Sequence, residues 1–543
     1  MNLKKISVLL GATALTFSLA ACGGETADNA NNANTANEGD DNTATETTGG
    51  DNYVFAYGSE PQNLLIPGNT NETGGGRIVD ENYAGLVYYD AEGETHNDMA
   101  ESIELEGDTT YKVTLKDGVK WADGTDVTAK DFVDAWNYTV ENALLGAYFF
   151  EPIKGYEEGK PLEGLEVVDD KTFTIELAQP EADFPQRLGY SAYFPLHPSA
   201  YDDIDAYGEN PISNGPYKLA EWNRNQDATI VPNEEYDGDR KPANDGVTFV
   251  FYAQQDAAYA DLLSGNLDVL DAVPDSALAN FEDELGDRAV NQPAAVFQSF
   301  TIGEKVDHFS GEEGKLRRAA LSHAIDREEI TKAIFEGTRT PATDFTSPVI
   351  PGHSDNLEDA DVLTYDPEEA KRLWEEADAI SPFEGEFTLS YNADGGHQAW
   401  VDAVTNSIRN TLGIEAVGNA YPDFKSLRDD VTNRTIEGAF RTGWQADYPS
   451  LGNFLGPLYG TGAGSNDSDY SNADFDLLLK QANAAPDIDA AIDEYNSAQK
   501  ILLEDLPAIP LWYSNVTGGY SENVDNVVFS WKSLPVYNQI TKK

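Results

Sequence analysis

The sequence predicts a mixed α/β protein with more than one domain. Its 543 residues exceed the ~250–300 residues at which single hydrophobic cores stop growing, so we expect two or three domains. Hydrophobic residues make up 40% of the chain and aromatic residues 11%, which is enough to fill sizeable cores. From Tyr53 onward, short segments that alternate every second residue are interleaved with segments of helical periodicity. No long linker rich in Pro and Ser interrupts residues 51–543.

The clearest predicted elements lie between residues 109 and 177. Residues 109–115 and 172–177 alternate apolar and polar side chains, as expected of strands with one buried face. Thr128 and Asp131 have the spacing of a capping box, in which two side chains satisfy backbone donors at the start of a helix. Apolar residues then follow at helical spacing. The apolar positions of these elements are Tyr111, Val113, Leu115, Phe132, Ala135, Trp136, Val140, Phe173, Ile175 and Leu177.

Two consecutive helices are predicted further along the chain. Leu316, Ala320 and Ala324 recur at helical spacing. Asp326, followed three residues later by Glu329, is a start signal for a second helix. One helix is therefore expected to run directly into another at this point.

The charge of the chain is strongly negative. Its 35 basic and 96 acidic residues give −61, which argues against binding to nucleic acid or to an anionic membrane through a basic patch. Taking away Lys4 and Lys5, and the six acids of residues 23–50, leaves 33 basic and 90 acidic residues, or −57. The charge is therefore a property of the folded body, which should repel an anionic membrane surface.

The N-terminal segment predicts export and a lipid anchor. Lys4 and Lys5 precede an apolar stretch, residues 6–21, that is too short to span a membrane comfortably. The stretch ends in Leu-Ala-Ala before Cys22, and this resembles the lipobox of bacterial lipoproteins. The alternative is an ordinary secretory signal with a chance cysteine. We expect a signal peptide at 1–21, a diacylglycerol on Cys22, and a protein anchored in the cell membrane on its extracytoplasmic face.

Residues 22–50 are predicted to be a disordered acidic tether. Beyond Cys22 they contain only Asn, Thr, Ala, Gly, Asp and Glu, so they cannot bury apolar surface.

Because Cys22 is the one cysteine of the sequence, an intrachain disulfide and a CxxC site are both excluded. No later segment is long and apolar enough to span a membrane.

The sequence lacks the common catalytic and metal-binding motifs. It contains no HExxH, GxSxG or GxxxxGKS/T, and its six histidines show no metal-ligand spacing. Ser497–Lys500 fits SxxK, but this short pattern recurs by chance and is expected on a helix face. Asn233–Gly238 resembles only the start of an EF-hand loop and lacks its final Glu. We therefore expect no enzymatic activity, no metal and no cofactor.

Six segments resemble the motifs of one protein family, in that family's order. The longest, Lys116 to Phe132, reads KDGVKWADGTDVTAKDF and is similar to the signature segment of family 5 extracellular solute-binding proteins. These proteins are the peptide-binding components of ABC importers. The resemblance covers essentially all of the chain after the tether. The other five segments are 213–219, 262–268, 317–327, 443–449 and 470–476.

The resemblance implies a two-lobe, periplasmic-binding-protein-like α/β fold with an additional inserted domain and a cleft that closes about a hinge. A monomer would capture a peptide in this cleft and deliver it to the permease subunits of an ABC transporter. The implied boundaries are 51–86, 212–298 and 518–543 for lobe I, 87–211 for the inserted domain, and 299–517 for lobe II.

Three candidate ligand-binding residues lie in the segment that reads RTGWQAD. Asp447 is implied to pair with the α-ammonium of a peptide, because an enclosed ammonium needs a carboxylate to replace its water. The alternative is a carboxylate that caps local backbone amides. Arg441 is implied to reach a ligand carboxylate, or else forms an ion pair with a nearby acid, Asp447 among them. Trp444 could stack on a ligand or fill the core.

Two further candidates are carried by weaker similarity. Glu72 falls near a pocket-lining acid of the family, and Tyr148 resembles an aromatic residue of the inserted domain that faces the cleft. An ordinary surface or packing role is an equal alternative for both. Gly74–Gly76 could allow close approach of backbone to a ligand, but a plain flexible loop is the favoured interpretation.

These observations predict a peptide-binding lipoprotein of an ABC transporter. A different ligand, such as an oligosaccharide, an opine or a metal chelate, is the first alternative. A peptide-signal sensor shares the same fold and is the second. A cell-wall hydrolase is disfavoured because the sequence lacks catalytic motifs. The negative charge should also disfavour strongly acidic peptides at low salt.

Overall fold

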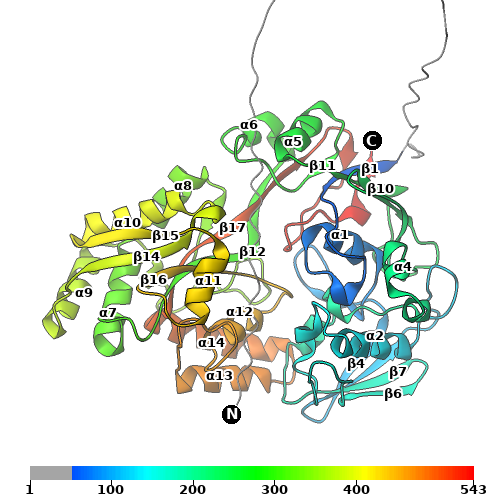
Figure 1. Ribbon diagram of the computed structural model, residues 1–543, viewed down its shortest axis with the longest axis horizontal. Coiled ribbons are helices and arrows are strands. Elements are labelled where there is room, and N and C mark those ends of the chain that lie inside the picture. The colour runs from blue at the N-terminus through cyan, green and yellow to red at the C-terminus, as the bar shows by residue number, and fades with distance from the viewer. Residues whose placement is uncertain (1–51) are drawn as a thin grey trace, which may run out of the picture. The chain divides into compact units, whose positions relative to one another are not determined.

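The computed structural model describes residues 52–543, which form a mixed α/β structure (Figure 1). The predicted signal peptide, Cys22 and the tether lie outside the described residues. Within 52–543, no helix combines the length and the apolar character needed to cross a membrane. No cluster of His, Cys, Asp and Glu side chains suited to holding a metal ion occurs in the same residues.

One large mixed sheet carries segments from both ends of the chain. Its strands follow the order β15-β14-β16-β12-β17-β11-β1-β10-β9-β8, and β13 also pairs with β17. The bounds in chain order are β1 (Tyr53–Gly58), β8 (Tyr217–Asn223), β9 (Asp227–Pro232), β10 (Gly246–Phe251), β11 (Val269–Leu270), β12 (Ala289–Ile302), β13 (Arg339–Pro341), β14 (Glu386–Asn392), β15 (Glu415–Tyr421), β16 (Ala439–Gln445) and β17 (Ala508–Tyr520).

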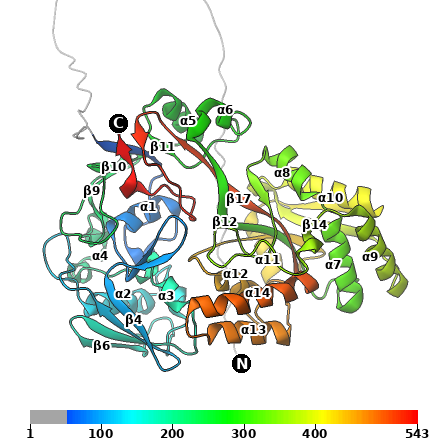
Figure 2. The same ribbon diagram turned by 180° about the vertical axis from the view of Figure 1, so that it is seen from behind.

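The two longest strands, β12 and β17, pair antiparallel and lie side by side in both views (Figures 1 and 2). Their register runs from Ala289 opposite Gly519 to Thr301 opposite Ala508. The register shifts between Pro293 and Phe297, where proline cannot donate a ladder hydrogen bond. The predicted lobe boundaries at 298 and 517 fall inside these strands, and the division into lobes at those residues stays a prediction.

A second, four-stranded antiparallel sheet lies within the segment predicted to be an inserted domain. Its order is β4-β5-β7-β6. The predicted strands are confirmed, with the alternate residues Tyr111, Val113 and Phe173 buried. Helix α2 packs on this sheet through Phe132 and Trp136, whose rings lie 6.1 and 5.7 Å from that of Phe173. The bounds are β4 (Ala100–Glu106), β5 (Thr110–Leu115), β6 (Leu165–Asp169), β7 (Thr172–Glu176) and α2 (Ala129–Glu141).

The signature segment owes its local structure to Asp131. The predicted capping box is present at the start of α2, where the Thr128 backbone N–H donates to Asp131 Oδ2 over 2.9 Å. The fully buried Trp121 donates its indole N–H to the same oxygen over 3.2 Å. Asp131 therefore joins the helix start to the loop that precedes it.

The predicted pair of consecutive helices is confirmed as α7 and α8. Asp326 caps α8, because its Oδ1 accepts the Glu329 backbone N–H over 3.0 Å. Ser497–Lys500 lies on α14, as predicted. The bounds of the remaining helices are α1 (Thr73–Asn82), α3 (Phe184–Arg187), α4 (Ile204–Glu209), α5 (Gln255–Ser264), α6 (Phe281–Leu285), α7 (Gly311–His323), α8 (Arg327–Phe335), α9 (Pro367–Ile380), α10 (Gln398–Leu412), α11 (Phe424–Thr432), α12 (Gly452–Tyr459), α13 (Ala473–Asn483) and α14 (Ile488–Asp505).

Two short antiparallel pairs complete the strands of residues 52–543. They are β2 (Val87–Tyr89) with β3 (Thr95–Asn97), and β18 (Val524–Asp525) with β19 (Thr541–Lys542). The last pair places the C-terminal end near Asn52, the first described residue, since the Lys542 backbone N–H donates to Asn52 Oδ1 over 3.0 Å.

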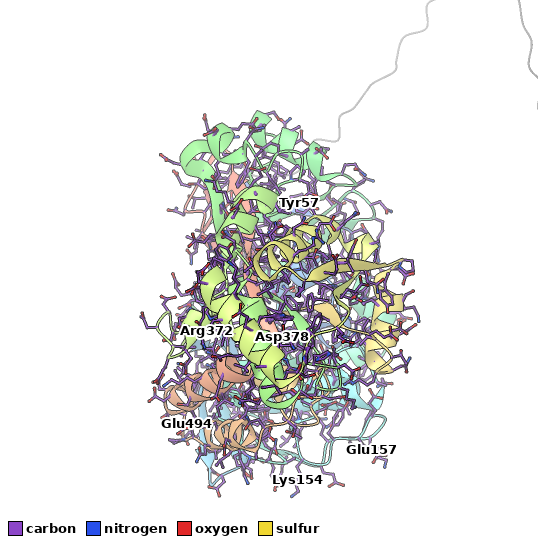
Figure 3. All side chains as sticks on the ribbon, turned by 90° about the vertical axis from the view of Figure 1, so that its left-hand side faces the viewer. Tyr57, Lys154, Glu157, Arg372, Asp378 and Glu494 are labelled. Carbon is purple, nitrogen blue, oxygen red and sulfur yellow. The ribbon has the colours of Figure 1, made fainter. Side chains whose placement is uncertain are left out.

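Exposed charges on the surface form mainly local pairs. Figure 3 labels Lys154, Glu157 and Arg372 among the outer side chains. Arg372 pairs with Glu369 and Glu376 on its own helix, each over 2.6 Å. Such exposed pairs contribute only ~0–1 kcal/mol each to stability.

We expect Asp131→Ala to lower the free energy of unfolding by about 1–3 kcal/mol, because it leaves the buried Trp121 indole N–H and the partly buried Thr128 N–H without an acceptor. Asp131→Asn is the matched control, since its amide retains an acceptor oxygen and should cost less. Urea denaturation followed by circular dichroism measures both. Equal stability of Asp131→Ala and the wild-type protein would contradict this account of the segment.

Candidate functional site

A cavity of about 640 Å³ lies between the segment predicted to be an inserted domain and the segment after β16. Its volume is within the range of small-molecule sites, about 300–1,000 Å³. The first wall comes from residues 148–152 and 178–187, and the second from residues 444–465, 479–483 and Tyr495. Tyr148, Trp444 and Asp447 all line it, so three of the predicted ligand-binding residues meet in one place.

Asp447 is held by Asn453, a residue that the sequence did not single out. The Asp447 backbone N–H donates to Asn453 Oδ1 over 3.0 Å, and Asn453 Nδ2 donates to Asp447 Oδ2 over 3.3 Å. Trp444 donates its indole N–H to the same Asn453 Oδ1 over 3.2 Å. One amide side chain thus orients both predicted residues. Among residues 52–543, none donates a hydrogen bond to Asp447 Oδ1, so this oxygen is available to a ligand.

The electrostatics of Asp447 suit a cationic partner. Partial burial raises the pKa of its carboxyl above the ordinary value, while the hydrogen bond from Asn453 and the positive charges of Arg187 and Lys532 act in the opposite direction. A cation beside Oδ1 would offset the desolvation of the carboxylate. The arrangement therefore favours an ammonium or guanidinium group over a neutral or anionic ligand group.

Tyr148 faces Asp447 from the opposite wall. It belongs to a single 3₁₀ turn, Ala147–Phe150, and its side chain is 52% exposed. Burial of its hydroxyl, together with the negative charge of Asp447, raises the pKa of Tyr148 to about 12. The pKa of Tyr190 is raised by burial and then by the charges of Asp447 and the Tyr148 oxygen. Both hydroxyls therefore stay protonated at neutral pH and can donate hydrogen bonds.

Arg441 lies in a neighbouring cavity of about 260 Å³. It is on β16, opposite Phe300 of β12. Its Nε donates to Asn392 Oδ1 over 2.9 Å, and its guanidinium lies 5.1 Å from the ring centre of Phe424. Trp444 lines this cavity as well as the larger one, so it stands between the predicted ammonium and carboxylate contacts. Trp444 is half-buried and also packs on the core of its region.

Glu72 is the N-cap of α1. Both its carboxylate oxygens accept the Gly75 backbone N–H, each over 3.0 Å, and Oε1 also accepts the Gln62 N–H over 3.1 Å. A role for Glu72 toward a ligand stays a prediction. The favoured interpretation of Gly74–Gly76 as a flexible loop is wrong, because these glycines form the first turn of α1. The cap supplied by Glu72 offsets the low helix propensity of glycine.

Two contacts join the walls of the larger cavity. Ser450 donates its hydroxyl to Asp183 Oδ2 over 2.9 Å. The guanidinium of Arg187 lies 4.9 Å from the ring centre of Tyr448, next to Asp447. Asp183, Arg187 and Tyr190 were not expected from the sequence, because they carry no motif and meet the second wall only through the tertiary fold.

The match to a family model identifies the class of protein to which this fold and cavity belong. The model described as "Bacterial extracellular solute-binding proteins, family 5 Middle" matches residues 94–466. The chain therefore belongs to family 5 of the bacterial extracellular solute-binding proteins.

Several relatives match over most of their length. The chain is 27% identical to the oligopeptide-binding protein OppA of Bacillus subtilis, over 97% of both chains. It is 28% identical to the periplasmic murein peptide-binding protein MppA of Escherichia coli, over 81% of this chain and 83% of that protein.

Solved structures confirm the predicted two-lobe α/β fold. The unliganded open form of MppA matches with a TM-score of 0.81 and 24% identity, over 90% of this chain and 97% of that one. OppA of Haemophilus influenzae, in complex with the peptide RPPGFSPFR, matches with a TM-score of 0.65 and 24% identity, over 90% of this chain and 98% of that one. These likenesses establish the architecture.

We expect Asn453→Ala to lower the free energy of unfolding by about 1–3 kcal/mol, because it removes the acceptor of two donors at the cavity wall. Asn410→Ala, which changes an exposed asparagine on α10, is the control and should stay within about 0.5 kcal/mol of the wild-type protein. Chemical denaturation compares the two. Similar stability of both variants would show that Asn453 does not hold this loop.

Proposed function

We propose that this protein binds peptides and delivers them to the permease of an ABC importer. The observation that carries the proposal is Asp447, whose Oδ1 is open to a ligand inside a cavity of about 640 Å³. Family membership and relatives named for oligopeptide, murein peptide and dipeptide binding support a peptide as the ligand.

The proposed binding mode places the peptide α-ammonium on Asp447. Tyr148, with a protonated hydroxyl, can donate a hydrogen bond to the peptide backbone from the opposite wall. The carboxylate of a short peptide would reach Arg441 in the adjacent cavity, passing Trp444. Because recognition would rest on the peptide's charged ends and backbone, side chains could vary widely.

A deoxycholate-like ligand is the alternative suggested by one relative, a probable deoxycholate-binding protein of Escherichia coli that is 27% identical. Its carboxylate would have to enter a cavity lined by Asp447, Glu151, Glu181 and Asp183, with Arg187 the one cationic group in the described lining. The repulsion between like charges disfavours such an anion. The same lining supports a ligand with a free amine.

Attachment and delivery form the remainder of the proposal. A signal peptide at 1–21 and a lipid on Cys22 would hold the protein at the extracytoplasmic face of the membrane. The tether would let the folded body reach the permease as a monomer, and closure of the lobes around a peptide would mark the loaded state. The charge of −57 would keep the body away from the anionic surface.

We expect Asp447→Ala to weaken the binding of an unblocked tripeptide by about 10- to 100-fold, the range for a lost charge-assisted contact. N-terminal acetylation of the peptide should weaken binding to the wild-type protein equally, and should add little in Asp447→Ala, because both changes remove the same contact. Titration calorimetry on residues 51–543 measures the four affinities. If the losses of affinity from the substitution and from acetylation add, the peptide ammonium binds at a site other than Asp447.

The same site predicts a pH dependence. Because the pKa of Asp447 is raised, lowering the pH from neutral toward about 4 should protonate it earlier than an ordinary aspartate, whose pKa is near 3.9. Affinity for an unblocked peptide should therefore fall as the pH falls, and level off at high pH. Asp447→Asn should flatten this profile, and an unchanged profile in that variant would argue against Asp447 as the titrating group.

A further inference from the structure

Helix α12 turns a side with only short side chains toward the cavity of about 640 Å³. The residues of this helix that line the cavity are Gly452, Asn453, Gly456 and Pro457. These two adjacent pairs are four residues apart, so they lie on one side of the helix. The remaining side buries the bulky residues Phe454, Leu455 and Tyr459 in the core. The core therefore holds the helix in place, and the cavity side stays open.

The two glycines on the cavity side have different surroundings. A Cβ at Gly452 would lie 2.6 Å from Tyr495 Oη and 2.8 Å from Asp183 Oδ2, so packing excludes a side chain there. A Cβ at Gly456 would have no atom within 4 Å, apart from its chain neighbours and the backbone of its own helix. Glycine is among the least favourable residues inside a helix. Packing therefore explains the glycine at 452 but leaves the glycine at 456 without a reason in the fold.

Gly456 lies one helical turn from the residue that holds Asp447. Asn453 Nδ2 donates to Asp447 Oδ2 over 3.3 Å. Residues three apart on a helix have their Cβ positions about 5–6 Å from each other, so the open space at Gly456 begins beside Asn453. A peptide with its α-ammonium on Asp447 carries its first side chain on the carbon that bears this ammonium. The first side chain can therefore reach the space in front of Gly456.

We propose that Gly456 determines the size of the first side chain of the peptide, and that its missing side chain lets the cavity accept a large one such as phenylalanine. This inference rests on the proposed peptide-binding function. Asp447 would fix the amino end of any peptide, while Gly456 would set how much room the adjoining side chain has.

The neighbouring lining suits an aromatic side chain. Tyr148, Phe149, Pro457 and Leu479 contribute apolar surface to the same cavity. The rings of Tyr148 and Phe149 lie 4.3 Å apart, and the Tyr148 side chain is 52% exposed. A ring that enters the cavity would remove this apolar surface from water, and aromatic pairs add to the gain. A large first side chain should therefore favour binding as long as residue 456 leaves it room.

The test compares the tripeptides Phe-Ala-Ala and Ala-Ala-Ala by titration calorimetry on residues 51–543. We expect the wild-type protein to bind Phe-Ala-Ala at least as tightly as Ala-Ala-Ala. Gly456→Leu should weaken the binding of Phe-Ala-Ala by about 10- to 100-fold, because two large groups would compete for one space. The same variant should change the affinity for Ala-Ala-Ala by less than about threefold.

Two further variants locate the effect. Gly456→Ala adds only a Cβ next to Pro457, and proline disfavours a helical backbone in the residue before it. This variant measures the backbone effect alone and should leave both affinities within about threefold of the wild-type values. Ala260→Leu enlarges an exposed residue of α5 outside the cavity lining and should leave the ratio of the two affinities unchanged.

Thermal unfolding followed by circular dichroism checks that each variant folds. Gly456→Met, with a flexible unbranched side chain, takes the place of Gly456→Leu if the leucine variant does not fold. The methionine variant should show the same selective loss of affinity for Phe-Ala-Ala.

Each outcome decides the proposal. An unchanged ratio of affinities in the enlarged variant, or an equal loss for both peptides, would overturn the role of Gly456 while leaving peptide binding intact. A comparable loss in Gly456→Ala or Ala260→Leu would overturn it as well. So would a wild-type protein that binds Ala-Ala-Ala but not Phe-Ala-Ala. If the wild-type protein binds neither peptide, both this inference and the proposed function fail.

Discussion

The long antiparallel pairing of β12 and β17 is the constraint on which the rest of the structure depends. β17 pairs on its other edge with β11 and β13, and β12 with β16, so the large sheet is continuous through these two strands. The register of β12 against β16 places Phe297 opposite Trp444 and Phe300 opposite Arg441. A slip of one residue would turn both site residues to the other face of the sheet.

A second feature of the structure is that its buried carboxylates differ in how fully other groups satisfy them. The structure satisfies Asp131 with two donors, but within residues 52–543 it leaves Asp447 Oδ1 without a hydrogen bond. A buried carboxylate without full compensation is destabilised until a cation arrives. A binding protein can use this energy, because the ligand replaces solvent at groups that are already in place.

Local elements were predictable where one physical pattern dominated. The strands around Val113 and Phe173 followed from alternation, and the start of α2 from the spacing of Thr128 and Asp131. The prediction that Gly74–Gly76 form a flexible loop failed because it considered only the glycine content. The carboxylate of Glu72, just before these glycines, caps the helix that they begin. Of the five candidate ligand-binding residues, the structure brings Tyr148, Trp444 and Asp447 to one cavity. It places Arg441 in the adjacent cavity.

Composition and local motifs were enough to establish the acidic character of the body, its α/β pattern and the resemblance to a solute-binding family. These properties depend on residues close together in sequence. Only the tertiary structure revealed the contacts of Asn453 and the place of Glu181 in the cavity lining, because neither residue belongs to a motif. Glu181 faces the Asp447 loop across more than 250 residues of chain. Its charged neighbours Asp183 and Arg187 lie close to it in sequence, but its place in one cavity with Asp447 comes from segments that the fold brings together.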